Sequence, residues 1–532
     1  MKSNRPPNRF RRRAAIGVLT AAATLLTATA SSAAATTPTG TVRAPLPAAA
    51  EGPQGGVLRY ATVSEPTTLD PHKGTSGGDH VSLYPIYDTL LTADPATLET
   101  QPGLATEWDY PDDNSLRLVL REDVTFTDGT PFNAEAVVYN IDRGVNMEDS
   151  SVKPELSAVE SVEAVGDYEV LIHLTQPDSS LLGVFTDRAG MMVSPAAAEA
   201  DPDFGLNQPV GTGPHMLTNW NQGIDWSYER NPDYWQEGLP YLDGLEFTLL
   251  ADSNTRVNGL RSGQFDFVDS LEPIQLTDLQ GVDGLTVDAS PTLLEHMIWW
   301  NMGRAPLDDV RVRRAINLAI DREAMWAGTM EGTGEVAWLP IPSTHWAFTE
   351  DLVPTFAYDP DQARALLEEA GYADGFTLVA SSSNAPDAVR RAEILQANLA
   401  EIGIDFQVRP QQTVESVEAY FESQRVDAYN SSMTARADPS ITYQTMFSNT
   451  SYHNTGKWSP DGFEDLLAEA KSVTDPEARA EVFARINAMV VDQAMWVPLV
   501  YPDSITALSN EFTGFTPSLI GKADFLTVHL AE

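Results

Sequence analysis

The eight histidines of this 532-residue chain are the first candidates for metal or acid–base chemistry. They are His72, His80, His173, His215, His296, His345, His453 and His529. None belongs to an H-E-x-x-H sequence or an H-x-H pair, the short spacings that favour two imidazoles on one metal ion. The sequence therefore gives no support for a zinc hydrolase, and we expect no catalytic residue, no metal site and no cofactor.

Ser76 is the one serine in a pattern known from nucleophilic catalysis. It stands at the centre of a G-x-S-x-G sequence at residues 74–78. The nucleophile elbow with this pattern requires a hydrophobic strand before it and a helix after it, which together turn the serine outward. Residues 69–73 (LDPHK) do not form such a strand. We interpret the segment as a loop of small residues, and a secreted serine hydrolase using Ser76 remains an alternative.

Two further features of the sequence offer no support for catalytic or redox chemistry. Residues 332–337 (GTGEVA) partly resemble a dinucleotide-binding fingerprint, but no strand precedes them. The chain has no cysteine, which excludes disulfides, thiolate metal ligands, cysteine nucleophiles and a lipid-anchor cysteine. A protein of this size without a catalytic motif is more readily explained as a binding protein than as an enzyme.

The charge balance excludes several classes of partner. The chain has 33 Lys or Arg against 76 Asp or Glu, a formal net charge of −43. Such a surface repels phosphate backbones and anionic lipid headgroups, so we expect no nucleic-acid partner. An apolar content of 42% with 11 tryptophans is typical of a folded, soluble chain.

The first 35 residues resemble a secretory signal peptide. Six bases without an acid precede a run of mostly Ala, Leu, Val and Ile at residues 14–30, and small residues at 28–30 and 33–35 offer cleavage sites. Residues 36–55 are rich in Ala, Thr, Pro and Gly, which predicts a flexible linker. We therefore expect an extracytoplasmic protein, secreted, associated with the cell envelope or located in the periplasmic space. The export route, by the general or the twin-arginine pathway, and the mode of retention at the cell stay open.

Strand and helix patterns alternate after residue 57. Period-two alternation of apolar residues predicts strands at 116–120, 170–174 and 404–408. Asp359-Pro360 and Asp475-Pro476 each supply a helix cap and a first-turn proline, and apolar stripes follow them. A third stripe at 392–402 runs through Gly403 into a strand, an arrangement typical of α/β proteins with mixed sheets covered by helices.

Several phrases, in order, resemble the extracytoplasmic solute-binding proteins of ABC importers, family 5, the oligopeptide, dipeptide and nickel-binding group. They occupy residues 64–72 (SEPTTLDPH), 103–108 (GLATEW), 120–132 (LREDVTFTDGTPF), 209–214 (PVGTGP), 229–235 (ERNPDYW), 308–317 (DDVRVRRAIN), 474–479 (TDPEAR) and 496–501 (WVPLVY). Any one phrase alone is weak evidence, but their order across roughly residues 55 to 505 identifies the chain as a member of this family.

The resemblance implies a two-lobed fold like that of periplasmic binding proteins, with a ligand cleft and a hinge. Lobe I is expected to combine residues 51–87, 207–295 and 500–532. Residues 88–206 are expected to form an extra domain attached to it, and residues 296–499 to form lobe II. A ligand that contacts both lobes shifts the population toward the closed form, which a membrane permease can recognise.

The resemblance also implies where the ligand binds. In the loop at 73–78 the candidates are Thr75, Ser76 and Gly77, whose surroundings allow close backbone approach. Of the neighbouring Trp299 and Trp300, only one can face the cleft because successive strand residues face opposite sides, and we favour Trp299. That both tryptophans belong to the core is the alternative. Residues 384–391, expected as a loop before a helix, complete this part of the cleft.

The segment at 430–439 is expected to supply Asn430, Met433, Arg436 and Asp438. In oligopeptide and dipeptide binders an aspartate in this loop pairs with the α-amino group of the ligand. The alignment gives Arg436 at that position, and a guanidinium favours carboxylate or phosphate instead. A shift of one or two residues makes Asp438 the amine partner. The alternative is that both residues form ion pairs with protein side chains.

These observations favour a binding protein in transmembrane transport that captures a peptide-like or other small polar solute and delivers it to an ABC permease by hinge closure. We expect a monomer. Besides the serine hydrolase, the alternative is a protein that captures a peptide signal or a metal chelate. The identity of the solute, whether peptide, sugar, opine-like compound or chelate, is not encoded in any motif.

Overall fold

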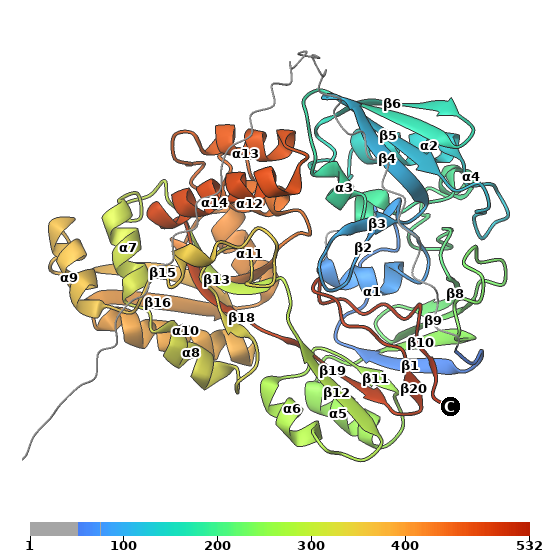
Figure 1. Ribbon diagram of the computed structural model, residues 1–532. Helices are drawn as coiled ribbons and strands as arrows, with labels where there is room; N and C mark the ends of the chain where they lie inside the picture. Colours follow the sequence, from blue (N-terminus) through green and yellow to red (C-terminus); the bar gives the residue numbers. More distant parts are fainter. Residues whose placement is uncertain (1–51, 75) are drawn as a thin grey trace, which may run out of the picture. The chain divides into compact units, whose positions relative to one another are not determined.

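The computed structural model describes residues 52–74 and 76–532 and contains five β-sheets with helices packed on the larger ones (Figure 1). The predicted signal peptide, most of the predicted linker and Thr75 lie outside these residues. Within the described part of the chain, no helix is long and apolar enough to cross a bilayer. The chain has mixed α/β content, as the sequence predicts.

The largest sheet has seven strands, in the order β12-β19-β11-β1-β10-β9-β8. Their bounds are Val57–Thr62 (β1), His215–Asn221 (β8), Asp225–Arg230 (β9), Gly244–Leu249 (β10), Phe267–Val268 (β11), Leu285–Ser290 (β12) and Ser504–Ser509 (β19). Strand β1 pairs in parallel with β10 and β11, and the outer pairs are antiparallel. Edge-to-face aromatic contacts of Tyr60, Phe247, Phe267 and Phe525 fill one core of this sheet.

A separate antiparallel sheet of four strands occupies part of the segment expected as an extra domain. Its order is β4-β5-β7-β6, with bounds Ala105–Asp112 (β4), Ser115–Leu120 (β5), Val159–Gly166 (β6) and Glu169–Leu174 (β7). Helix α2 (Ala134–Asn146) places Val137 and Ile141 in the core with the inward side chains of β5 and β7. The alternation of buried and exposed residues confirms the strands predicted near 116–120 and 170–174.

The third large sheet is mixed and has six strands, in the order β14-β18-β13-β17-β15-β16. The bounds are Leu294–Trp300 (β13), Glu335–Val336 (β14), Phe376–Ser383 (β15), Ile404–Gln411 (β16), Ala428–Thr434 (β17) and Val497–Tyr501 (β18). The strand predicted at 404–408 is therefore confirmed. Helix α10 (Pro386–Ala400) packs on β15 and β16, where Leu395 and Leu399 join the core.

The remaining elements are short strands and helices that cover or connect the sheets (Figure 1). Their bounds are Leu91–Ala93 (β2), Thr100–Pro102 (β3), Phe512–Thr513 (β20), His529–Leu530 (β21), His80–Leu83 (α1), Leu181–Val184 (α3), Pro195–Ala200 (α4), Ser253–Arg261 (α5), Pro273–Leu279 (α6), Val310–Leu318 (α7), Arg322–Thr329 (α8), Pro360–Glu369 (α9), Thr413–Val417 (α11), Pro439–Phe447 (α12), Phe463–Ser472 (α13), Pro476–Asp492 (α14), Gly77–Asp79 (η1), Arg188–Gly190 (η2), Glu350–Leu352 (η3) and the π-helical turn Glu418–Glu422 (η4).

The residues predicted from the sequence to start and stop helices do so in the structure. The Asp359 side chain accepts from the backbone N–H of Gln362, which caps α9, and Gly371 follows that helix with a φ of +88°. Asp475 caps α14 in the same way through the N–H of Ala478. One prediction was wrong: residues 386–391, expected as part of a loop, already form the first turns of α10 because Pro386 starts that helix.

The chain passes between the seven-stranded and six-stranded sheets through two short segments. Residues 291–293 join β12 to β13, and residues 502–503 join β18 to β19. The Thr292 hydroxyl donates to the carbonyl of Pro502 over 2.9 Å, which ties the two crossing segments together. At the other end of the described chain, Gln54 and Gly55, part of the predicted linker, hydrogen-bond to the carbonyls of Gly238 and Tyr241.

Candidate functional site

A cavity is lined by segments that are far apart in the sequence. Its volume is about 410 Å³, part of which is open to solvent. Its walls are Glu155, Gly183, Val184, Thr186 and Asp187 on one side, Thr434, Ala435, Arg436, Ala437 and Ile441 on another, and Ile520. In the first group, Glu155 lies between α2 and β6, and residues 183–187 follow β7 of the four-stranded sheet. The second group begins at Thr434, the last residue of β17 in the six-stranded sheet.

Arg436 brings a cation to this cavity and is paired only loosely. Its Nε lies 3.8 Å from Oε1 of Glu155, and the two side chains are 41% and 21% exposed. The backbone N–H of Arg436 donates to the Thr442 hydroxyl over 2.8 Å, which fixes the loop rather than the guanidinium. Burial raises the pKa of Glu155, and Arg436 opposes that rise. The side chain of Arg436 therefore keeps hydrogen-bonding capacity for a guest.

Asp438, two residues further on, is fully engaged by the protein. Two guanidinium nitrogens of Arg479 contact the Asp438 carboxylate, at 2.6 Å and 2.9 Å. The Asp438 side chain is 6% exposed and the Arg479 side chain is 10% exposed. The same carboxylate accepts from the N–H of Ser440 and caps α12. Burial alone would raise the pKa of Asp438, but Arg479 and Ser440 outweigh it and hold the pKa below its ordinary value.

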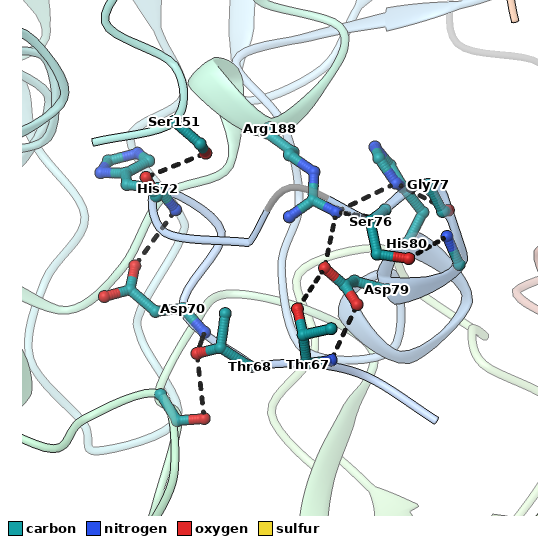
Figure 2. A network of polar contacts seen from close by, with 12 residues as sticks. Thr67, Thr68, Asp70, His72, Ser76, Gly77, Asp79, His80, Ser151 and Arg188 are labelled. Atoms are coloured by element: carbon teal, nitrogen blue, oxygen red, sulfur yellow. Dashed lines mark hydrogen bonds and ion pairs between the residues drawn. The ribbon is translucent and has the colours of Figure 1, made fainter. Parts of the chain in front are cut away.

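The loop before α1 is held by a network centred on Asp79 and Arg188 (Figure 2). Asp79 accepts from the N–H and hydroxyl of Thr67, at 2.8 Å and 3.0 Å, and from Nη2 of Arg188 at 3.0 Å. The same Nη2 donates to the carbonyl of Ser76. These bonds fix the backbone around Ser76 and Gly77, two of the predicted ligand residues.

A separate set of hydrogen bonds joins His72 to Asp70 and to Ser151 (Figure 2). The N–H and hydroxyl of Ser151 donate to the carbonyl of His72, at 2.8 Å and 3.1 Å. Asp70 accepts from the N–H of His72 and pairs with Arg143. Ser151 lies four residues before Glu155, so these hydrogen bonds tie the loop that contains the predicted ligand residues to the segment that leads to the cavity wall.

Asp187 and Lys522 complete the charged surroundings of the cavity. The Asp187 carboxylate pairs with Nε2 of His80, whose Nδ1 faces the carbonyl of Gly77. Burial would raise the pKa of Asp187, but His80, Lys522 and Arg436 together hold it well below its usual range. Burial lowers the pKa of the half-buried Lys522 to about 8, and Arg436 adds to that decrease.

Sequence reasoning missed Glu155, Asp187, Arg188 and Lys522. None of them lies in a phrase typical of the family, and each reaches the cavity region through tertiary contacts that periodicity does not encode. Asp187 and Arg188 did carry a local signal, because an aspartate directly before a short turn is a capping pattern.

The other predicted ligand residues lie deeper in the six-stranded sheet. Trp299 is 6% exposed and stacks on His453, with ring centroids 5.6 Å apart. Trp300 points to the other side of the strand and donates through Nε1 to the carbonyl of Met495. The amide of Asn430 donates to the Ser382 hydroxyl and to the carbonyl of Ala388, both over 3.0 Å. Met433 is half-buried, and the ligand role of all these residues stays a prediction.

Ser76 lacks the environment of a catalytic nucleophile. Its hydroxyl accepts from the N–H of Gly78 at 3.2 Å and caps the turn η1. Within the described residues no histidine hydrogen-bonds to it; the nearby His80 uses its ring nitrogens on Asp187 and Gly77. Nothing in this geometry favours the serine hydrolase. Among the described residues, no group of three or more His, Asp or Glu is arranged to hold a metal ion.

Solved structures with the same arrangement of sheets define the class of protein. The periplasmic binding protein DppA from Helicobacter pylori, in complex with the peptide STSA, superposes with a TM-score of 0.80 at 26% identity, covering 90% of this chain and 99% of that chain. The dipeptide-binding protein from Pseudoalteromonas sp. SM9913, in complex with Met-Leu, gives a TM-score of 0.79 at 25% identity, with 90% and 100% covered. The fold is that of a periplasmic binding protein, as predicted.

Sequence comparison narrows the class to one family. Residues 99–454 match the model of bacterial extracellular solute-binding proteins, family 5. The glutathione-binding protein GsiB of Escherichia coli K12 is 31% identical over 464 residues, which is 84% of this chain and 90% of that protein. The chain belongs to the bacterial extracellular solute-binding proteins, family 5, and the expectation of ligand capture for ABC import is confirmed.

Proposed function

We propose that this protein binds a small peptide-like polar solute in the cavity between residues 155–187 and 434–441 and presents it to an ABC permease. The observation that supports the proposal is the cavity itself, because its walls come from both sides of the two crossing segments. Opening about those segments exposes the cavity, and closing encloses the guest. The relatives named as glutathione-binding and dipeptide-binding proteins, and the relative solved in complex with the peptide STSA, support the peptide-like class.

The proposed division into lobes places one part of the chain on each side of the two crossing segments. Lobe I comprises residues 51–87, 207–295 and 500–532, the extra domain comprises residues 88–206, and lobe II comprises residues 296–499. Residues 291–293 and 502–503 act as the hinge. Ser76, Gly77, Trp299, Asn430, Met433 and Arg436 contribute to binding, together with Thr75, which lies outside the described residues. Asp438 holds the 434–438 loop in place through Arg479 rather than contacting the guest directly.

The proposed setting is extracytoplasmic. Residues 1–35 act as a signal peptide, and the mature chain is a monomer whose partner is a membrane permease. The family supports both a small-molecule or peptide ligand and such a permease. Without residues 1–35 the chain carries 27 Lys or Arg against 76 Asp or Glu, a formal net charge of −49, which favours solubility of the exported protein at neutral pH.

The proposal is tested by identifying the guest and watching closure. Mass spectrometry of compounds released by denaturing the purified protein identifies what it captures. Small-angle scattering with reduced glutathione and with short peptides is expected to show a smaller radius of gyration on binding. As a control for chemistry, the purified protein and Ser76→Ala are compared for hydrolysis of the same peptides, and equal background rates are expected. Scattering that does not change with any ligand, together with turnover that Ser76→Ala abolishes, would contradict capture without reaction.

A further inference from the structure

Residues 178–180 of the proposed extra domain contact helix α13 of the proposed lobe II. The backbone N–H of Ser179 donates to the carbonyl of Lys471 over 2.7 Å. Lys471 lies in the last turn of α13. The crossing segments 291–293 and 502–503 are the covalent connections of lobe II to the rest of the chain. The hydrogen bond between Ser179 and Lys471 therefore belongs to a separate, non-covalent contact.

The same contact contains a buried ion pair. Nζ of Lys471 lies 3.2 Å from Oδ2 of Asp178, and the two side chains are 10% and 1% exposed. The other oxygen of Asp178 accepts from the N–H of Ser180 at 3.0 Å and from the Ser180 hydroxyl. In the part of the chain that the structure describes, no second carboxylate lies within 4.0 Å of the Lys471 ammonium. The extra domain thus holds the carboxylate in place, and separation of the two parts would deprive Lys471 of its ion-pair partner.

A glycine allows a second close approach of the same two parts. A Cβ atom added to Gly183, in helix α3, would lie 2.9 Å from the Cβ of Asp438, which is closer than real Cβ atoms approach other atoms. Arg479, which pairs with Asp438, also donates through Nε to the carbonyl of Ala470 over 2.8 Å. Because Ala470 directly precedes Lys471, both contacts of the extra domain reach one connected unit of lobe II.

These contacts adjoin the cavity without filling it. Gly183 and Val184 belong to the cavity wall, whereas Asp178 and Lys471 do not. Ile441, in the wall contributed by lobe II, packs against the core of the four-stranded sheet. Opening the cavity on this side therefore breaks the hydrogen bond, the ion pair and the apolar packing together.

We propose that Asp178, Ser179 and Gly183 of the extra domain and Lys471 of lobe II form a clasp that closes part of the unliganded population. The inference rests on the proposed function, because it uses the lobes and the hinge assigned there. The extra domain then has a task of its own, since it sets the closed fraction before any ligand arrives. Because the ligand is enclosed only in the closed form, its apparent affinity is proportional to that fraction.

The energetics of a buried ion pair give the clasp a recognisable signature. Removing one partner leaves the other charged, buried and uncompensated in the closed form, whereas water can reach it in the open form. Asp178→Asn and Lys471→Met should therefore each favour opening. The double variant leaves no unpaired charge, so it should be more closed than either single variant.

The absence of cysteine from the sequence makes the closed fraction directly measurable. Ser161→Cys in the extra domain and Gln362→Cys in lobe II introduce two thiols at exposed positions for spin labels. Pulsed electron paramagnetic resonance of the unliganded protein then gives the distribution of distances between the labels. We expect a closed component when the clasp is unaltered. In each single variant the ratio of closed to open molecules should fall by about tenfold or more.

A steric wedge tests the clasp without altering a charge. Gly183→Ala places a methyl group against Asp438 and should also lower the closed fraction of the unliganded protein. Its matched control is Gly328→Ala in α8, where an added Cβ meets no atom within 4 Å. Asp266→Asn is the control for the ion pair, because it breaks a pair with Arg59 inside the proposed lobe I. Both controls should leave the distance distribution unchanged.

Ligand affinity provides a second measurement. The ligands used are L-alanyl-L-alanine and reduced glutathione, and calorimetry measures their binding to each clasp variant. Asp178→Asn and Lys471→Met should weaken both ligands by one common factor, equal to the loss in closed fraction, because neither residue lines the cavity. A saturating ligand should restore the closed distance in both variants.

Urea unfolding of every variant separates opening from loss of the fold. Lys471→Arg keeps the charge and should remain more closed than Lys471→Met, and Gly183→Ala replaces any ion-pair variant that does not fold. Three results would overturn the clasp. They are an unaltered, unliganded protein without a closed component, single variants with unchanged distances, and single effects that simply add in the double variant.

Failure of the clasp and failure of the proposed function give different results. If the clasp variants open the protein but no compound is captured and neither ligand binds, the clasp stands and capture is contradicted. If a captured compound closes the protein while the clasp variants behave like the unaltered protein, capture stands and the clasp is wrong.

Discussion

Two ion pairs formed by one loop show how the same residue types serve different purposes. Asp438 and Arg479 form a bidentate pair that is nearly inaccessible to water, whereas Arg436 and Glu155 meet at 3.8 Å with side chains 41% and 21% exposed. A buried pair with several hydrogen bonds is sensitive to the loss of one partner, and a loose exposed pair contributes little stability. We infer that Asp438 stabilises the loop, whereas the side chain of Arg436 is available to a ligand.

The largest expected effect comes from breaking the buried pair. Asp438→Asn leaves Arg479 charged, buried and uncompensated, and should lower the free energy of unfolding by about 3–5 kcal/mol. Urea denaturation monitored by tryptophan fluorescence measures this change. The control is Asp361→Asn, which removes the exposed pair with Arg364 and should cost no more than about 1 kcal/mol. If Asp438→Asn unfolds like the unaltered protein while losing ligand affinity, Asp438 is the amine partner after all.

A smaller effect, on binding rather than stability, is expected for the loose pair. Arg436→Ala should weaken the captured ligand by roughly 1.5–3 kcal/mol, because a charge-assisted hydrogen bond is lost. Its free energy of unfolding should change by less than about 1 kcal/mol. Calorimetry with the co-purified compound measures the first quantity, and Arg436→Lys should recover part of it. If Arg436→Ala binds the ligand with unchanged affinity, Arg436 does not contact the ligand, and its proposed difference in role from Asp438 is wrong.

A third expected effect concerns the pH dependence of the unliganded protein. The pKa of Lys522 falls from 10.5 to about 8 on folding, so the unfolded chain binds more protons between these values. Folding stability linked to Lys522 therefore rises as pH increases from about 8 to 10.5. For Asp438 the folded pKa is depressed, so its contribution is present above the unfolded value and is lost as pH falls through the folded pKa.

Thermal unfolding measured from pH 7 to 10.5 separates the Lys522 contribution from other titrations. As pH rises, the unfolding temperature of the unaltered protein should increase relative to that of Lys522→Met, because only the unaltered protein has the Lys522 ammonium to deprotonate. A difference that is constant across this range would show that the ammonium of Lys522 is as well solvated in the folded chain as in the unfolded chain.

The sequence predicted local structure well where one segment contains its own signal. Asp359 with Pro360 starts a helix and Gly371 follows its end, so the bounds of α9 follow from capping and left-handed geometry alone. The period-two stripe near 116–120 likewise fixed a strand. The start of α10 was missed because Ala385 precedes Pro386 without a side-chain cap, and the proline alone looked like part of a loop.

The site was predicted less completely, because its chemistry depends on distant partners. The 434–438 loop was recognised from its resemblance to the family, but the role of Asp438 is decided by Arg479, 41 residues later. Strand alternation predicts that Trp299 and Trp300 face opposite sides of the strand, and their side chains contact different partners. The stack of Trp299 on His453, however, depends on a segment from another part of the chain. Lys522 gave no signal at all, since an isolated lysine in a loop is ordinary.

The distance in sequence between the cavity walls has a consequence for how the protein is made. The last wall residue, Ile520, follows the first, Glu155, by more than three hundred residues, so a nascent chain cannot complete the cavity until nearly all of these residues have left the ribosome. Contacts between such distant segments incur a large loop-closure entropy and form slowly. Ligand affinity should therefore be the last native property to appear during refolding, after the sheets have acquired their secondary structure.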